Sequence, residues 1–383
     1  MLLAERTEQL DELLGISIAG FDIPDSLYAR VISRYEHTAS ALADYWPDGA
    51  GLIYPQGSIR LGTVTAPIDR EGEYDLDFVC RRELLREQIT KRELKLDVGD
   101  GLRGYVLLGP DGQPLLKEGG RCWTLDYPKE PFHMDVLPAI PDDGLGASKT
   151  AILITDRDEA LWLNSDPIAF ADWFHARMRE ELIQLSEAVA KRMEIERAPA
   201  SELKTALQRA VQALKRHRDI HFRGSTKDAP ASVIITTLAA RAYRPGGSLH
   251  EVLVDITARM PGFVERDEAG WRIANPVASE ENFADRWEGH PKRVQQFFDW
   301  IERAQSDFAG FGSERGVDTV LVKLAESFGE VPARFARERL GGEVRQMRDR
   351  RLLGVAATGA LGSAGRRVPQ HTFHGDPPEP RRA

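Results

Sequence analysis

"YPQGSIRLGTVTAPIDREGEYDLDFVC" at residues 54–80 combines a Gly-Ser step, Gly57–Ser58, with two aspartates one residue apart, Asp75 and Asp77. Successive side chains of a strand point to opposite faces, so both aspartates are expected on one face of the strand "EYDLDFVC", with its apolar residues facing the core. Like charges this close repel unless cations or hydrogen-bond donors compensate. Mg²⁺ does so because it prefers carboxylate oxygens together with phosphate. The alternative is that both aspartates lie on a solvated sheet face.

The Gly-Ser step is a candidate phosphate cradle. Gly57 and Ser58 follow the apolar run "LIY" and the turn-forming Pro55. A strand-to-turn arrangement of this kind leaves backbone N–H groups free, and Gly lets an anion approach them closely. A helical turn over "SIRLG" would add partial positive charge at its first residues. Taken by itself, the step also fits a plain turn.

A third carboxylate occurs in the later stretch "PFHMDVLPAI", where Asp135 lies in an otherwise apolar strand with His133 on the same face. An aspartate inside a buried strand costs free energy unless it is paired or metal-bound. If Asp135 lies beside Asp75 and Asp77, the three complete a two-metal site of the kind that clamps the attacking and leaving oxygens of an in-line displacement. A merely paired structural aspartate remains the alternative for Asp135.

Composition indicates an ordinary folded protein. At 383 residues, with 42% hydrophobic and 29% charged residues, the chain is long enough for two domains. Its formal charge of -9 argues against an obligate, extended nucleic-acid partner. The two cysteines, Cys80 and Cys122, suggest neither a disulfide framework nor a four-ligand zinc site. With no long apolar run and an acidic, amphipathic start, we expect a cytoplasmic protein without a membrane segment.

The first half of the chain reads as a mixed sheet with helices. Residues 26–46 have the apolar spacing of an amphipathic helix. Between residues 51 and 141, short apolar runs alternate with turn residues and predict strands. These runs are "GLIYP", "YDLDFVC", "GYVLLG", "CWTLDY" and "FHMDVLPAI".

The second half reads as helical from about residue 166. "DPIAFADWFHARMREELIQLSEAVAKRM" predicts a helix with Asp166 as its cap, and "SELKTALQRAVQALKRHRDIHF" predicts another with Ser201 as its cap. "PKRVQQFFDWIERAQSDFAGF" predicts a third helix, whereas "PASVIITTLAARAY" fits a buried helix or a strand. The last 30 residues are rich in Gly, Ala, Pro and Arg and predict a mobile tail.

The Gly-Ser step, the paired aspartates and the later strand aspartate resemble the pattern of DNA polymerase β-type nucleotidyltransferases. More narrowly, the chain resembles bacterial cyclic GMP-AMP synthase-like and oligoadenylate synthetase-like nucleotidyltransferases (CD-NTases), the signal-making enzymes of CBASS anti-phage systems. The resemblance covers about residues 25–300. It rests on "PQGSIRLGT", "EYDLDFVC", "FHMDVLPAI", "LKRHRDIHF", "ASVIITTLAA" and "NPVASEENFADRW".

This resemblance implies an α+β fold with two lobes. We expect a polymerase β-like nucleotidyltransferase core, a mixed sheet with helices, at residues 1–165 including the N-terminal helices. A helical, oligoadenylate synthetase-like lobe that closes the active-site cleft is expected at 166–345. The flexible C-terminal tail is expected at 346–383.

The resemblance also implies roles for the acidic residues. Asp75 and Asp77 would bind two Mg²⁺ ions, with Mn²⁺ as a substitute, and Asp135 would complete the site on the acceptor side, where it helps to deprotonate the attacking ribose hydroxyl. All three are therefore predicted to be both metal ligands and catalytic residues.

A second set of residues is expected to bind the donor nucleotide. The resemblance implies that the Gly-Ser step holds the β- and γ-phosphates, and that a lysine and a Ser/Thr of the helical lobe contact the triphosphate. Lys204 and Lys215 are three helical turns apart, so they would project in nearly the same direction; solvated surface lysines are the alternative. The predicted substrate-binding residues are Gln56, Gly57, Ser58, Lys204, Lys215, Thr236 and Thr237.

Two segments have a simpler interpretation beside the one that the resemblance implies. "NPVASEENFADRW" at 275–287 is expected to be a capping loop docked on the core, and the resemblance makes it a candidate wall of the cleft. In some of these operons, regulatory or ubiquitin-transfer-like proteins act on the enzyme's C-terminal glycine. "HTFHG" at 371–375 resembles such an ending, although "DPPEPRRA" follows it, and plain disorder is the simpler interpretation.

The sequence therefore predicts a metal-dependent nucleotidyltransferase that joins nucleoside triphosphates, ATP among them, into a cyclic di- or trinucleotide second messenger. The alternatives are an enzyme that makes linear oligonucleotides or modifies RNA or protein, and a non-catalytic nucleotide-binding module. Base identity, ring size and linkage cannot be inferred from these motifs.

Overall fold

The computed structural model describes most of the chain. The described residues are 2–46, 51–69, 72–108, 114–144, 146–155, 161–192, 204–268, 270–314, 316–355, 361–362 and 365–369. Among them, no helix combines the length and the apolar character that crossing a bilayer requires. The "HTFHG" stretch lies outside the described residues, as does Ser201.

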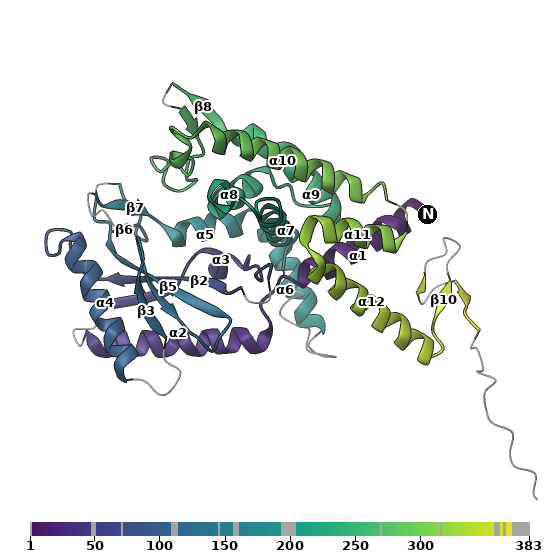
Figure 1. The fold of residues 1–383 in the computed structure, drawn as a ribbon, viewed down its shortest axis with the longest axis horizontal. Coiled ribbons are helices and arrows are strands. Elements are labelled where there is room, and N and C mark those ends of the chain that lie inside the picture. Colours follow the sequence, from purple (N-terminus) through teal and green to yellow (C-terminus); the bar gives the residue numbers. More distant parts are fainter. Residues whose placement is uncertain are drawn as a thin grey trace, which may run out of the picture.

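A seven-stranded sheet forms the centre of the first lobe (Figure 1). Its main path runs β1-β2-β5-β4-β3, with β6 added beside β5 and β7 beside β6. The strands are β1 (Gly51–Pro55), β2 (Tyr74–Arg82), β3 (Leu115–Glu118), β4 (Trp123–Asp126), β5 (Phe132–Pro141), β6 (Ile152–Ile154) and β7 (Leu163–Ser165). Since β2 and β5 run parallel and the other neighbours antiparallel, the sheet is mixed, as the sequence predicted.

One face of this sheet packs on two helices, α2 (Asp25–Tyr45) and α4 (Lys91–Leu108). Leu76 and Phe78 of β2 are buried there, which leaves the aspartates of the same strand on the opposite face. The opposite face looks toward the second lobe (Figure 1). Because side chains alternate along β2, the apolar residues face the core of this lobe and the two aspartates face away from it.

The prediction of a strand at "GYVLLG" was wrong, because these residues lie at the end of α4 or just after it. Leu94, Val98, Leu102 and Tyr105 are all buried and are spaced by four, four and three residues. That spacing is the stripe of a helix packed on one face. The short apolar run suggested a strand because the other residues of this buried stripe lie earlier in the helix, outside the run.

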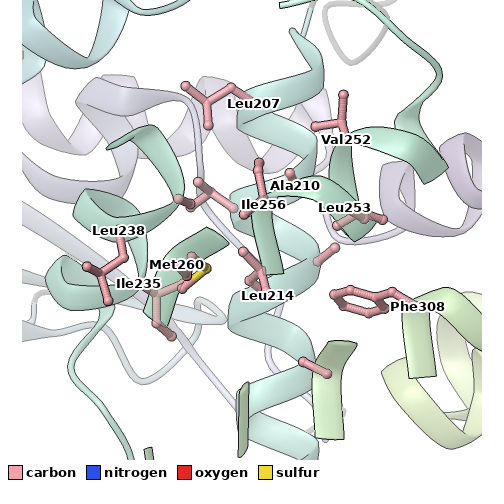
Figure 2. Packing of buried hydrophobic residues seen from close by; sticks show 14 of the residues in the cluster. Leu207, Ala210, Leu214, Ile235, Leu238, Val252, Leu253, Ile256, Met260 and Phe308 are labelled. Atoms are coloured by element: carbon pink, nitrogen blue, oxygen red, sulfur yellow. The ribbon is translucent and has the colours of Figure 1, made fainter. Parts of the chain in front are cut away.

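The second lobe is helical. Its helices are α5 (Pro167–Ala176), α6 (Arg179–Arg192), α7 (Ala206–His221), α8 (Ser232–Ala242), α9 (Leu249–Arg259), α10 (Pro291–Phe311), α11 (Val317–Phe328) and α12 (Glu330–Asp349). Figure 2 shows Leu207, Ala210 and Leu214 of α7 in the middle of the core that α8, α9 and α10 complete. A short hairpin, β8 (Glu265–Asp267) and β9 (Gly270–Arg272), extends from this lobe.

Several helix boundaries differ from the sequence prediction. Asp166 caps α5 as expected, since its side chain accepts a hydrogen bond from the backbone N–H of Ala169, but the predicted single helix breaks at residues 177–178 before α6 begins. The cap of α7 is Thr205 and not Ser201: Thr205 and Gln208 form a reciprocal capping box. The "PASVIITTLAARAY" stretch is the helix α8, and α10 has the predicted bounds.

The N-terminal helix α1 (Leu2–Ala19) belongs to the core of the helical lobe. Its Leu10, Leu13 and Leu14 are buried in the same cluster as α7, α9 and α11. The predicted unit 1–165 therefore differs from the packing at its start, because α1 crosses to the other lobe while α2 stays with the sheet.

The predicted tail begins inside α12. Its described residues include three two-residue strands, β10 (Gly354–Val355), β11 (Leu361–Gly362) and β12 (Arg366–Arg367), which pair as a small antiparallel sheet. The composition of this segment did not predict any local structure.

Candidate active site

A cavity of about 980 Å³ lies between the two lobes. It is lined by the start of α3 (Gly57–Leu61), the exposed face of β2, strand β7, the ends of α7 and α8, and the loop at 275–286. Of the predicted site residues, those that line the cavity are Gln56, Gly57, Ser58, Asp75, Asp77, Lys215 and Thr236. The structure thus collects residues from distant parts of the sequence around one space.

The three predicted carboxylates lie together; Asp75 and Asp77 line the cavity, whereas Asp135 is beside them and is not among the lining residues. Asp75 and Asp77 occupy one face of β2, and Asp135 is the direct register partner of Asp77 on the parallel strand β5. Each aspartate offers an oxygen that lies within 4.8 Å of one from each of the others. This confirms the predicted cluster, and such a set of hard oxygen donors fits a divalent cation of the Mg²⁺ class.

The charges of the cluster are poorly compensated by the protein itself. Burial, together with the negative charges of Asp75 and Asp135, raises the pKa of Asp77 to about 7. Lys215 and His133 lower it only in part. The raised pKa shows that the negative charges of the cluster repel one another. A bound cation would compensate these charges strongly, so the electrostatics support metal-dependent catalysis.

Donors from β4 and the residue before it hold the side chain of Asp135. The hydroxyl of Thr124 donates to Oδ1 of Asp135 over 2.5 Å, and the thiol of Cys122 donates to Oδ2 over 3.2 Å. Thr124 is the antiparallel register partner of Asp135, which places its side chain on the same face. The sequence analysis missed both donors; strand alternation in "CWTLDY" could have shown their face, but not which strand lies beside β5.

His133 holds Asp75 in a similar way. Its Nε2 lies 3.3 Å from Oδ1 of Asp75, and its Nδ1 lies 3.0 Å from Oε2 of Glu73. A hydrogen bond to Asp75 raises the pKa of His133 to about 9, with smaller contributions from Glu73. The sequence analysis placed His133 on this face but gave it no role.

The Gly-Ser step opens a short helix beside the carboxylates. Gly57 has φ +55°, in the left-handed region, and a Cβ at this position would lie 2.8 Å from Oδ2 of Asp77. Both the backbone conformation and the contact therefore favour glycine. The helical turn predicted over "SIRLG" is confirmed as α3.

The two predicted lysines have different positions. Lys215, on α7, lines the cavity, and its Nζ donates to the carbonyl and the hydroxyl oxygens of Thr63, both at 3.2 Å. Burial and the nearby Arg218 lower the pKa of Lys215 to about 8. Lys204 precedes α7, so the helical-turn argument does not apply to it, and its Nζ lies 2.5 Å from Oδ1 of Asp22. Lys204 is not among the residues that line the cavity.

The two predicted threonines are also separated by the fold. Thr236 lines the cavity, and its hydroxyl donates to the carbonyl oxygen of Ser232 one turn earlier in α8. Thr237 is fully buried in the helical lobe and is not among the residues that line the cavity. Of this pair, only Thr236 lines the cavity, although it too is buried.

The segment at 275–287 is a wall of the cavity and is also docked on the core, since Trp287 is buried in the helical lobe and Phe283 packs against the same cluster. Both interpretations that the sequence analysis gave therefore hold. Two asparagines fix its shape. Asn275 donates to Oε2 of Glu281 and accepts from the N–H of Val277, while Asn282 accepts from the N–H of Ile273 and donates to the carbonyl of Trp271. The residues of this wall that line the cavity are Asn275, Glu280, Glu281, Asn282, Phe283, Asp285 and Arg286.

Comparison with known proteins places this geometry among nucleotidyltransferases. No family model matches the chain. The chain is 28% identical over 380 residues to the c-di-GMP synthase of Roseivirga ehrenbergii, with 96% of this chain and 98% of that protein covered. It is also 26% identical over 306 residues to the cyclic dinucleotide synthase CdnG of Bradyrhizobium diazoefficiens, with 73% of this chain and 70% of that protein covered.

Solved structures agree with the sequence comparison at the level of the fold. The structure of Bradyrhizobium diazoefficiens CdnG in complex with GTP matches with a TM-score of 0.67 at 22% identity, over 87% of this chain and 99% of that one. The cyclic AMP-GMP synthase DncV of Vibrio cholerae, in complex with nonhydrolysable GTP, matches with a TM-score of 0.56 at 17% identity, over 87% of this chain and 89% of that one. The chain thus aligns along nearly the whole length of a cyclic dinucleotide synthase, and its fold is that of the CD-NTase CdnG.

Proposed function

We propose that the protein synthesises a cyclic dinucleotide from nucleoside triphosphates, with GTP as substrate and cyclic di-GMP as the product. The observation that carries the proposal is the cluster of Asp75, Asp77 and Asp135 beside a cavity that Gly57, Ser58 and Lys215 line. The activity of the Roseivirga relative, which aligns along nearly the full length of both chains, supports this choice of product.

The carboxylates are proposed to hold two Mg²⁺ ions, which Mn²⁺ can replace; bound there, the metal neutralises charge on the attacking hydroxyl and the leaving pyrophosphate. Asp75 and Asp77 serve as ligands from one strand. Asp135, whose two oxygens are fixed by Thr124 and Cys122, orients the acceptor ribose hydroxyl and takes part in removing its proton.

The donor triphosphate is proposed to lie along the start of α3. Gly57 and Ser58 contact its β- and γ-phosphates, with Gln56 beside them. Lys215 and Thr236 line the same space from the helical lobe, so they are proposed to add a cation and a hydroxyl to the phosphate site. In this arrangement both lobes bind the triphosphate, and the catalytic carboxylates all come from the sheet.

Cavity size supports a product built from two nucleotides. A drug-sized ligand occupies a pocket of about 300–1,000 Å³. The cavity here, at about 980 Å³, is at the upper end of that range, which fits a donor and an acceptor bound at once. The linear intermediate then rebinds with its ends exchanged, and the second transfer closes the ring.

Carboxylates outside the aspartate cluster support guanine over adenine as the base. Asp219, Glu280, Glu281 and Asp285 line the cavity, together with the basic Arg60, Arg121, Arg218 and Arg286. Guanine presents two adjacent donors, N1–H and the N2 amino group, which one carboxylate accepts together. Adenine presents an acceptor at N1, so the same carboxylate repels it. We further propose that the product acts as a second messenger in anti-phage defence, the setting in which the resembling enzymes work.

The test is product analysis with purified protein, Mg²⁺ or Mn²⁺, and labelled ATP, GTP, CTP and UTP, alone and in mixtures. After phosphatase treatment, we expect a resistant product from GTP alone, with the mass of a cyclic dinucleotide. The variants Asp75→Asn and Asp77→Asn should give none. A phosphatase-sensitive linear product, or label transferred to RNA or protein, would establish one of the alternative activities. Synthesis that survives both substitutions would overturn the proposed site.

A further inference from the structure

The segment that follows the phosphate-binding step has no partner strand of its own. Residues 62–67 connect α3 to the region before β2 without forming a strand. Their carbonyl groups must nevertheless be satisfied, because an unpaired buried carbonyl costs free energy comparable to a lost hydrogen bond. Several of the partners come from a single helix of the other lobe, α7.

Four side chains on one face of α7 bind this segment and the residue before it, from positions 208, 212, 215 and 216. That spacing of four, three and one residues keeps them on one side of the helix. Gln208 Nε2 donates to Leu61 O over 2.9 Å, Gln212 Nε2 to Val64 O over 2.6 Å, Lys215 Nζ to Thr63 O over 3.2 Å and Arg216 Nη2 to Ala66 O over 2.6 Å. All four side chains are buried.

Each glutamine makes a second contact that fixes its orientation. The Oε1 of Gln208 accepts from the backbone N–H of Thr205, as part of the capping box of α7. The Nε2 of Gln212 also donates to Oδ1 of Asp22 over 2.8 Å. Thr205 thus fixes the amide of Gln208 and Asp22 fixes that of Gln212, while both amides donate to the sheet lobe.

This contact joins the two halves of the phosphate site. The N–H of Thr63 donates to Ser58 O over 2.8 Å, so the held segment also restrains α3 and its Gly-Ser step. The same helix, α7, carries Lys215, Arg218 and Asp219 into the cavity. The distance between the Gly-Ser step and Lys215 is therefore set by one row of hydrogen bonds from α7 to residues 61–66.

We infer that Gln208 and Gln212 are positioning residues for the donor phosphates: they touch no substrate, but they fix the Gly-Ser step of one lobe against Lys215 of the other. Neither glutamine is among the residues that line the cavity. Loss of either amide donor should weaken binding of the triphosphate more than it weakens the fold. The inference rests on the proposed function, because it assumes that this cavity holds a nucleoside triphosphate.

Gln208→Glu separates positioning from helix capping. A glutamate at this position retains the acceptor that the capping box needs, since Glu and Gln both serve at the third helical residue. It loses the amide donor to Leu61 O and places a negative charge against that carbonyl. Thr205→Ala is the matched control, because it removes the capping hydroxyl and leaves the amide of Gln208 next to Leu61. Gln212→Met is a second test of similar side-chain volume.

The experiment measures the dissociation constant of GTP with Mg²⁺ by calorimetry, the kcat of product formation and the melting temperature of each variant. We expect Gln208→Glu and Gln212→Met to raise the dissociation constant about tenfold, because the Gly-Ser step and Lys215 are no longer held at the separation that the triphosphate needs. Thr205→Ala should lower the melting temperature yet leave the dissociation constant within about twofold, since a lost cap costs helix stability alone.

The outcomes separate this inference from the proposed function. If the wild-type protein binds no nucleoside triphosphate, both are wrong. If it binds GTP and makes product but the two glutamine variants bind GTP as tightly as wild type, only the positioning role is overturned. If Thr205→Ala weakens binding as much as Gln208→Glu, the amide acts through helix stability, and the positioning role is likewise overturned.

Discussion

Gly57 lies so close to Asp77 that a Cβ on the glycine would stand 2.8 Å from Oδ2 of the aspartate. The Gly-Ser step and the strand that carries Asp75 and Asp77 are thus in direct contact, and both the backbone angle and the space at residue 57 favour glycine. This contact explains why two motifs that are each common in isolation have a specific meaning when they occur together.

Gly57→Ala should therefore reduce the rate of product formation by about 100-fold, the cost of displacing reacting groups by about 1 Å. Backbone strain of about 1–2 kcal/mol in the left-handed region should in addition lower the melting temperature of this variant. Gly289→Ala is the matched control: Gly289 has φ +68°, but a Cβ on it would extend into open space, with no contact within 4 Å. We expect that control to lower the melting temperature with activity within about twofold of wild type; equal losses of activity would contradict the contact argument.

Asp77→Asn should stabilise the protein in EDTA at pH 8 while it abolishes synthesis. Burial and the charges of Asp75 and Asp135 raise the pKa of Asp77 to about 7 in the folded state, above its ordinary value near 4 in an unfolded chain. Between these values the folded state binds more protons, so its stability falls as the pH rises. Between pH 4 and pH 8 the free energy of unfolding of the wild type, measured by thermal unfolding, should fall by about 1–2 kcal/mol. This figure is smaller than the full pKa shift implies, because water in the open cleft screens the charges. The share of this loss that comes from Asp77 should be absent in the variant, whereas His133, whose pKa is also raised in the folded state, still contributes a loss above about pH 6.5.

Metal binding reverses this trend, which provides an internal check on the same sample. Because a divalent cation binds the ionised carboxylates, added Mg²⁺ should raise the melting temperature of the wild type more at pH 8 than at pH 5. The Asp77→Asn variant should show little of this increase. A wild-type melting temperature that ignores Mg²⁺ at pH 8 would speak against a metal site at this cluster.

The two lysines should separate catalysis from stability. Lys215→Met removes a cation from the cavity, and we expect the rate to fall by about 100-fold. Lys204→Met removes one of the donors to Asp22, which retains Arg209 and Gln212. This second variant should lose about 1–2 kcal/mol of stability and keep most of its activity. Steady-state rates and denaturant unfolding of both proteins provide the comparison, and a reversed order would restore the sequence-based role of Lys204.

Thr124→Val should weaken metal binding without unfolding the protein. The hydroxyl of Thr124 orients a metal-binding carboxylate, Asp135, and loss of such an outer contact costs about 10–100-fold in metal affinity. A titration of activity against Mg²⁺ should show a higher half-saturating concentration for Thr124→Val and near-normal behaviour for Thr124→Ser, which keeps the hydroxyl. Identical Mg²⁺ curves for Thr124→Val and wild type would show that Asp135 needs no such support.

The catalytic carboxylates could be predicted because their arrangement follows from local rules. Strand alternation places Asp75 and Asp77 on one face whatever the neighbouring strand is. Asp135 was proposed as the third member because a carboxylate inside an apolar strand needs a partner or a metal, and the parallel register of β2 and β5 puts it opposite Asp77. The Gly-Ser step was equally accessible, since it is defined by adjacent residues.

What could not be predicted depends on which elements meet. The sequence does not show that β4 lies beside β5, so the donors Thr124 and Cys122 were missed. It does not show where α7 begins, so Lys204 was placed on a helix that starts two residues later. The "GYVLLG" run was assigned to a strand because its packing partners within α4 lie outside the local window.

The wall at 275–287 has a consequence for how such an enzyme can change over generations. Its backbone path is maintained by Asn275 and Asn282, whose side chains bind main-chain groups, and by Asp285, whose carboxylate accepts from the backbone N–H of Arg286. Glu280 and Arg286 also line the cavity. Under the proposed function, substitutions at Glu280 and Arg286 would change which base is accepted and leave the carboxylates on the sheet untouched, so that selectivity and catalysis would be inherited separately.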